Sequence, residues 1–133
     1  MRGGPKVRSR QDECGAAVVE FALVAPLLLM MVLGIAEFGR AYHVQATLSQ
    51  AAREGVRVMA LKNDPAGALA ATRAAAPTLT LTNVTVTPSS CAASGLTPAA
   101  TATVTVTYSL AFISRLFGSG VTLTGKGVMR CNG

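Results

Sequence analysis

Residues 16–36, AAVVEFALVAPLLLMMVLGIA, decide the fold, because Glu20 is the only charged side chain in this run of 21 residues. A helix rises about 1.5 Å per residue, so the run is roughly 30 Å long and matches the hydrocarbon core of a bilayer. The next charged residue after Glu20 is Glu37. We therefore expect a transmembrane helix over residues 16–37.

The flanks of this helix predict its orientation. The preceding residues contain no apolar run and carry the basic side chains Arg2, Lys6, Arg8 and Arg10. Because short basic flanks stay in the cytoplasm, residues 1–15 are expected to be a cytoplasmic leader, with the C-terminal region extracytoplasmic. A signal peptide cut at Gly34-Ile35-Ala36 is the alternative, but its apolar core would be unusually long and would contain Glu20. A buried helix of a soluble protein fits less well, because this short chain cannot surround one.

The composition limits the classes of protein. The chain has 133 residues, of which 50% are hydrophobic and 14% are charged, and its mean hydropathy is +0.45. Soluble domains carry about 25% charged residues, so this balance indicates a membrane segment, and the length excludes a large multidomain enzyme. The formal net charge is +6, but aromatic residues make up only 5% and tryptophan is absent. A single-strand binder needs aromatic stacking surfaces, so nucleic acid is not an expected partner.

The helical pattern continues past the membrane segment. Apolar residues recur every three or four positions over residues 38–59, which predicts one helix over residues 16–62 with residues 38–62 as its outer continuation. Asn63-Asp64-Pro65 should end it, since a residue before proline is disfavoured in the α region and Asn and Asp favour turns. A short alanine-rich helix is expected over residues 65–76.

The remaining residues adopt the period of two that is typical of strands. Residues 78–87 alternate Thr with Leu and Val, with a change of parity at Asn83 that suggests a bulge. Residues 101–112 predict the clearest strand, since their even positions are apolar. A third strand is expected over residues 121–130, weakened or bent by Gly125 and Gly127.

Three such strands predict a small antiparallel sheet with one apolar side. Only the outer half of the long helix offers a matching apolar stripe to cover that side. The expected fold class is therefore α+β, with the small helix and the Thr-rich sheet forming an extracytoplasmic region over residues 63–133.

The three cysteines agree with this topology. Cys14 precedes the membrane helix on the reducing side, whereas Cys91 and Cys131 lie in the exported region, where disulfides persist. We expect Cys91 and Cys131 to pair, the alternative being two free thiols. In the chain-entropy model a bridge closing a loop of about 41 residues contributes roughly 4 kcal/mol to stability.

Nothing in the sequence indicates catalysis. His43 is the only histidine, and neither a nucleophile motif nor a pair of carboxylates in the sheet region accompanies it. Gly118-Ser119-Gly120 reads as a turn between strands, because no P-loop lysine or helix start follows it. One histidine and three scattered cysteines lack the spacing of a metal site. We expect no enzyme, no metal and no cofactor.

Glu20 is the most informative residue. A carboxylate at the centre of a membrane costs about 2.5–3.5 kcal/mol on insertion scales and usually has a partner. A cut between Gly15 and Ala16 would create an α-ammonium four positions from Glu20, able to pair within the chain or with a neighbour. The alternative is that Glu20 reaches water at the cytoplasmic interface. Glu37, by contrast, is expected on the helix surface near Arg40, a pairing worth about 0.2–0.5 kcal/mol.

Two parts of the sequence resemble known proteins. The run ECGAAVVEFALV, residues 13–24, is similar to the processing site and helix start of type IV pilin-like proteins, with Gly before the cut and Glu at the fifth position after it. GIAEFGR, residues 34–40, and AAREG, residues 51–55, resemble the TadE-like family, which comprises minor pilins or pseudopilins of the bacterial tight-adherence (Flp) pilus system. The resemblance covers residues 13–57, about one third of the chain.

The resemblance implies a structural role in pilus assembly. A membrane-embedded aspartic prepilin peptidase would remove residues 1–15, so that Gly15 and Ala16 form the processing site and Glu20 is the assembly residue. The mature protein would join other pilin subunits at an inner-membrane assembly platform driven by an ATPase. It would be a single-pass protein of the bacterial cell membrane that can enter a pilus. The alternative is an uncleaved, membrane-anchored module whose Thr-rich sheet binds an extracytoplasmic ligand.

Overall fold

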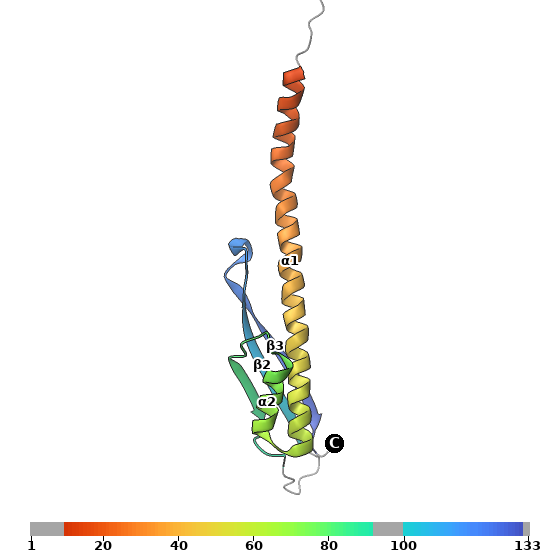
Figure 1. Cartoon of the computed structure of the whole chain (residues 1–133), viewed down its shortest axis with the longest axis vertical. Helices are drawn as coiled ribbons and strands as arrows, with labels where there is room; N and C mark the ends of the chain where they lie inside the picture. The colour runs from red at the N-terminus through yellow and green to blue at the C-terminus, as the bar shows by residue number, and fades with distance from the viewer. Residues whose placement is uncertain (1–9, 92–99, 132–133) are drawn as a thin grey trace, which may run out of the picture. The chain divides into compact units, whose positions relative to one another are not determined.

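A computed structural model describes residues 10–91 and 100–131 of the chain. Its elements are α1 (Arg10–Lys62), α2 (Pro65–Ala75), β1 (Asn83–Thr87), β2 (Thr101–Ala111), the short 3-10 helix η1 (Arg115–Phe117) and β3 (Gly120–Arg130) (Figure 1). Two compact units are distinguished, Met1–Ala36 and Glu37–Gly133. Most of the leader expected over residues 1–15, including Arg2, Lys6 and Arg8, lies outside the described residues.

The first unit contains the N-terminal part of α1. The helix begins at Arg10 and thus before the expected start at residue 16, and Pro26 does not interrupt it. Large apolar side chains of residues 16–36 are exposed, Phe21 and Leu23 to 73% each. By length and composition α1 is a helix that can cross a membrane. Apolar surface of this extent is unfavourable in water, so it requires lipid or other helices around it.

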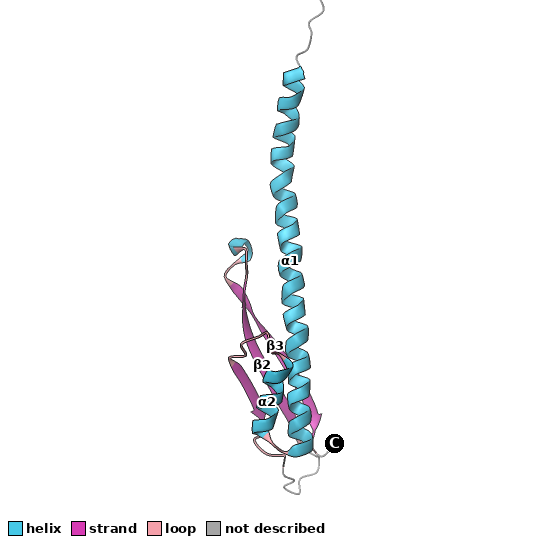
Figure 2. Cartoon of the chain, viewed as in Figure 1, coloured by secondary structure: helices cyan, strands magenta, loops and turns pink. Residues whose placement is uncertain are grey.

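The second unit is built on an antiparallel sheet with the strand order β1-β2-β3. Val84 and Val86 of β1 pair with Val106 and Val104 of β2, so the apolar residues of both strands share one face. The part of α1 beyond residue 37 covers this face. The buried core comprises Val44, Leu48, Ala52, Val56 and Met59 of α1 with Ala102, Val104, Val106 and Leu110 of β2. Figure 2 shows the sheet and α2 beside this part of α1. The predicted α+β fold is confirmed.

The opposite face of the sheet carries the threonines. On β2 they alternate with the buried residues and are exposed or half-buried, as are those of β1 and β3. This face comprises Thr85, Thr87, Thr101, Thr103, Thr105, Thr107, Thr122 and Thr124, together with Lys126 and Arg130. It is a polar surface with some positive charge, and none of the helices described in the second unit covers it.

The chain turns after α1 at the position that the sequence predicts. Asn63 has a φ of 50°, in the left-handed region that Asn tolerates, and its N–H donates to the carbonyl of Met59. Asp64 caps α2 by accepting a 2.9 Å hydrogen bond from the N–H of Gly67. The predicted break after residue 62 and the second helix are therefore confirmed.

The first strand is shorter than expected. Residues 78–82 do not form a strand, because the chain turns after α2 with a 3.1 Å hydrogen bond from the N–H of Leu79 to the carbonyl of Ala76. Leu79 and Leu81 pack against the core from this irregular segment. The change of parity at Asn83 thus marks the start of β1, and the expected bulge was wrong.

Gly125 and Gly127 also have a different role from the expected weakening or bending. β3 is continuous from Gly120 to Arg130, and the two glycines pair with Val106 and Val104 on the core face. A Cβ added at Gly125 would lie 2.5 Å from the Leu48 carbonyl group of α1, and one at Gly127 would lie 2.5 Å from the Ala52 oxygen. The missing side chains therefore allow the helix backbone to lie directly on β3.

Candidate functional site

The residues of the expected processing site lie within α1. Gly15 and Ala16 are both exposed, and a Cβ added at Gly15 would meet nothing within 4 Å. Ala16 and Glu20 are four residues apart, which places them about one helical turn from each other on the same side of the helix. The helix therefore places Ala16 and Glu20, which the sequence suggests as partners after a cut, about one turn apart.

Glu20 is exposed on an apolar stretch of helix. In residues 10–91 and 100–131, none of the hydrogen bonds or ion pairs that we find involves its carboxylate. Its neighbours Val19 and Phe21 are exposed to 61% and 73%. A single carboxylate on such a surface can meet a cation only when another group is brought to it.

Glu37 is buried, in contrast to the position on the helix surface that the sequence predicts. Its side chain is only 6% exposed. Oε1 accepts hydrogen bonds from the N–H groups of Ile113, at 2.6 Å, and Ser114, at 2.8 Å, and from the Ser114 hydroxyl at 3.4 Å. The other oxygen, Oε2, is buried without a hydrogen-bond partner in the described part of the chain. Glu37 therefore holds the segment after β2 against α1, and the expected position of Glu37 on the helix surface is wrong.

A signal for this burial was present in the sequence. Glu37, Ala41, Val44 and Leu48 follow one another in steps of four, three and four, which is the stripe of α1 that faces the sheet. The helical position of Glu37, rather than its charge, indicates its burial.

The environment of Glu37 lowers its pKa. The main cause is the N–H of Ser114, which donates to the ionised carboxylate. Burial opposes this by raising the pKa, but the Ile113 N–H, the Ser114 hydroxyl and the charge of Arg40 lower it further. Glu37 begins the second unit, beyond the apolar run of residues 16–36.

Two further polar side chains of α1 reach the strands. Arg40 donates from Nη1 to the carbonyl of Ala111 at 3.1 Å, at the end of β2. Gln45 donates from Nε2 to the carbonyl of Thr124 in β3 at 2.9 Å. Together with Glu37 these bonds position the β2–β3 hairpin against the first turns of α1 in the second unit.

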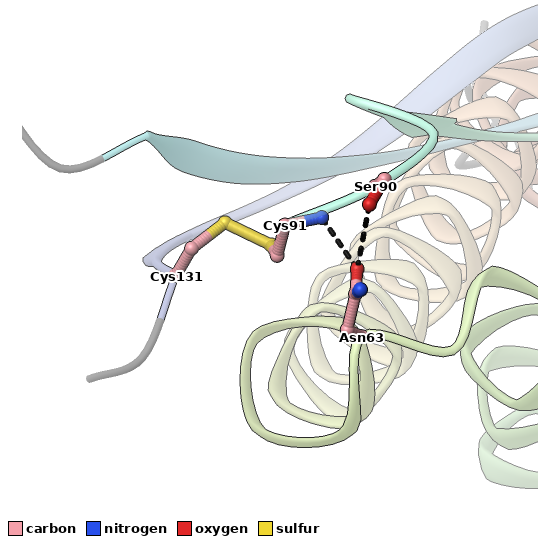
Figure 3. Close-up of a disulfide and its surroundings, with 4 residues drawn as sticks. All are labelled: Asn63, Ser90, Cys91 and Cys131. Atoms are coloured by element: carbon pink, nitrogen blue, oxygen red, sulfur yellow. Dashed lines mark hydrogen bonds between the residues drawn. A yellow bond between two sulfur atoms is a disulfide. The ribbon is translucent and has the colours of Figure 1, made fainter. Parts of the chain in front are cut away.

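The other end of this unit is held by a disulfide and an asparagine. Cys91 and Cys131 form the disulfide that the sequence predicts, with Cα atoms 5.5 Å apart. Figure 3 shows Asn63 directed at Ser90 and Cys91 beside this bridge. The Asn63 Oδ1 accepts from the Cys91 N–H at 2.5 Å and from the Ser90 hydroxyl at 3.3 Å. The end of α1, the segment after β1 and the end of β3 are thus joined at one place.

His43 lies exposed on α1, where its carbonyl accepts a hydrogen bond from the Thr47 hydroxyl. Among the residues that the structure describes, no three His, Cys, Asp or Glu side chains are grouped as metal ligands would be.

The comparison with known proteins rests on one part of α1. Residues 15–57 match the family model described as TadE-like protein. No curated protein and no solved structure matches the chain significantly. The match begins at the expected processing site and includes Glu20, Glu37, Arg40 and Gln45, whereas α2 and the strands lie outside it. The match covers residues 15–57, about one third of the chain, and this part of α1 is similar to the TadE-like family.

Proposed function

We propose that this protein is a minor pilin or pseudopilin, a structural component in the assembly of a tight-adherence (Flp) pilus. In this proposal a prepilin peptidase cuts between Gly15 and Ala16, and the mature protein enters an assembly of pilin subunits from an inner-membrane platform. The N-terminus lies in the cytoplasm and the sheet outside the membrane. The protein catalyses no reaction of its own.

The observation that carries this proposal is the exposed apolar surface of residues 16–36 interrupted by the carboxylate of Glu20. A simple anchor gains nothing from an acid in its span, because the charge makes insertion less favourable. An assembly subunit is stabilised by such an acid, because Glu20 can form an ion pair with a cation that becomes available during assembly. The family match over residues 15–57 includes this part of the helix.

The cation in this proposal is the α-ammonium that cleavage creates at Ala16. Ala16 and Glu20 are four residues apart on one helix, so the ammonium can reach Glu20 of its own chain or of an adjacent subunit. Pairing in the apolar interior of a bundle brings the helices to a defined axial register. Cleavage and assembly are then coupled, because the uncut chain lacks the ammonium.

The alternative is an uncleaved, membrane-anchored module that binds a ligand through the sheet. The exposed Thr-rich face with Lys126 and Arg130 favours this alternative, because it offers hydroxyl groups and positive charge without a covering helix in the second unit. The two candidates differ in the N-terminal residue of the mature protein.

The deciding experiment is intact-mass analysis of the protein extracted from membranes of its native host. Removal of residues 1–15, with Ala16 at the N-terminus, supports the pilin proposal. An N-terminus at Met1 or Arg2 supports the uncleaved module, and one at Glu37 supports a signal peptide.

Two variants make the assignment specific. Gly15→Leu introduces a bulky side chain at the cut and should prevent removal of the leader. Ala36→Leu changes the residue before the alternative signal-peptide cut and should leave processing at Gly15 unchanged. Loss of processing in Ala36→Leu but not in Gly15→Leu would contradict the proposal.

A further inference from the structure

The loop between β2 and β3, residues 112–119, carries apolar side chains that the core does not use. Ile113 is 79% exposed and Phe117 is 52% exposed, although both are large and apolar. Phe38 and Tyr42, on the first turns of α1 in the same unit, are exposed to 76% and 71%. Exposed apolar groups gathered at one end of a unit indicate a surface that something else covers.

Hydrogen bonds hold the loop to the first residues of α1 in the second unit. Its Ile113 and Ser114 N–H groups donate to Glu37, and Arg40 donates to Ala111 at the start of the loop. Glu37 follows directly after Ala36, the last residue of the apolar run. The loop is therefore hydrogen-bonded to the residue that directly follows the apolar run.

With residues 16–36 inserted in the hydrocarbon core, Glu37 would lie at the level of the headgroup layer of the bilayer. The layer is roughly 5–7 Å deep on each side of the hydrocarbon core, which is about four residues of helix. Side chains attached at Glu37 would then lie at the depth where aromatic and long basic residues are favoured.

The charges of the loop suit a lipid surface. Arg115 lies within the loop and Arg40 next to it, while residues 111–124 contain no acidic residue. Arg115 also lines an open hollow of about 480 Å³ together with Ala111, Phe112, Gly118 and Ser119. Guanidinium groups bind phosphates with two parallel hydrogen bonds, and basic groups near a membrane surface are attracted to anionic lipids.

We propose that the β2–β3 loop is a membrane-surface contact, in which Ile113 and Phe117 enter the boundary between headgroups and acyl chains and Arg115 binds lipid phosphates. The occupant is lipid rather than a second subunit, because the loop is fastened beside the end of the membrane span and combines apolar with basic side chains. The contact holds the sheet at the bilayer surface while the subunit is still in the membrane. The inference rests on residues 16–36 being inserted, and not on cleavage or pilus assembly.

The test uses the absence of tryptophan from the chain. The full chain with Phe117→Trp is reconstituted into vesicles of zwitterionic and anionic phospholipids, some with bromine atoms near the headgroup end of the acyl chains. Bromine quenches tryptophan fluorescence on contact, so we expect Phe117→Trp to lose most of its emission. Val128→Trp is the matched control, since Val128 is a 58% exposed apolar residue of β3 near the opposite, disulfide end of the sheet. It should remain unquenched.

Two more variants complete the design. Leu29→Trp, in the middle of the apolar run, should be quenched by bromine placed deep in the acyl chains, and failure to see this overturns the anchor and the loop contact together. Ile113→Trp repeats the loop measurement if Phe117→Trp does not fold. Adding Arg115→Gln should reduce the quenching of Phe117→Trp in anionic vesicles.

Two results overturn the proposal when Leu29→Trp is quenched. The first is quenching of Phe117→Trp and Ile113→Trp no stronger than that of Val128→Trp. The second is a blue-shifted but unquenched loop tryptophan, which means that protein, such as a second copy of the chain, covers the loop.

Discussion

At the scale of single residues, two glutamates of one helix have opposite environments. Glu20 is exposed among apolar side chains, whereas Glu37 is buried and accepts hydrogen bonds from the loop after β2. Both glutamates stand next to apolar residues, so the sequence around each does not show that their environments differ. The difference lies in what packs against each, which makes them useful as a pair of test positions.

Glu20→Gln should leave membrane insertion unchanged or improved and should abolish pilus assembly. The amide keeps the shape but cannot neutralise the α-ammonium at Ala16, and losing one partner of a poorly solvated ion pair costs roughly 3–5 kcal/mol. Pili sheared from cells and counted by electron microscopy measure assembly, and the mass of the membrane protein reports removal of the leader.

Glu20→Asp should give an intermediate number of pili, because the charge remains on a shorter side chain. Glu54→Gln, at an exposed position of the same helix, is the control and should assemble normally. Normal pili in Glu20→Gln with the leader removed would show that Glu20 is only an interfacial residue.

Glu37→Gln should loosen the β2–β3 loop while leaving the rest of the fold intact. Charge-assisted hydrogen bonds are about twice as strong as neutral ones, and Ile113 and Ser114 donate both of their N–H groups to this carboxylate. Hydrogen exchange should become faster at these two amides. Exchange at Val104 and Val106, in the middle of β2, should not change, and equal acceleration there would mean general destabilisation instead.

The same contact should be sensitive to acid. The pKa of Glu37 is lowered in the folded chain, so its contribution to stability is fully present above the unfolded pKa and is lost as the pH falls through the folded pKa. The amide chemical shifts of Ile113 and Ser114 should therefore titrate at a lower pH than an unperturbed glutamate does. Titration at the pH of an unperturbed glutamate or higher, or an unchanged curve in Glu37→Gln, would be inconsistent with the observed hydrogen bonds.

At the scale of elements, α1 and β3 lie in contact through two glycines. A Cβ at Gly125 would lie 2.5 Å from backbone atoms of Leu48, which cannot move aside as a side chain could. Gly125→Ala should therefore destabilise the second unit by about 1–3 kcal/mol, the usual cost of overpacking. The melting temperature of the detergent-solubilised chain, followed by circular dichroism, should fall by several degrees.

Gly39→Ala is the matched control for this prediction. Gly39 lies inside α1, and an added Cβ would meet nothing within 4 Å. Alanine is a better helix former than glycine by roughly 1 kcal/mol, so this variant should melt at the same or a higher temperature. If both variants shift the melting temperature in the same direction, close contact between α1 and β3 is not the cause.

At the scale of the whole molecule, the core is confined to the second unit. Every residue of the buried cluster lies between Val44 and Cys131, and the disulfide closes that unit. A fragment starting at Glu37 should therefore fold without the apolar run. Dispersed amide signals in its NMR spectrum would show this, and a collapsed spectrum for the oxidised fragment would show that the first unit is required.

Reduction of the disulfide gives the control for that fragment. A bridge between residues 40 apart contributes about 4 kcal/mol in the chain-entropy model, so the reduced fragment should unfold at much lower urea concentration. Alkylation under non-reducing conditions should leave Cys91 and Cys131 unmodified. An equal urea midpoint for both forms would mean that the bridge adds no stability.

The sequence by itself determined the features that depend on neighbours along the chain. The apolar run of residues 16–36, the break at Asn63-Asp64-Pro65, and the alternation of β2 follow from local periodicity and turn chemistry, and all three are present in the structure. The pairing of Cys91 with Cys131 followed from there being two cysteines on one side of the span.

Only the tertiary structure decided what depends on distant partners. Glu37 is buried because the N–H groups of residues 113 and 114 donate to its carboxylate. Gly125 allows close packing, and does not weaken β3, because the backbone of Leu48 lies against it. Local periodicity gives the side of an element on which a residue lies but not the groups that face it. The burial and hydrogen bonding of these residues therefore follow from packing between segments about 75 positions apart.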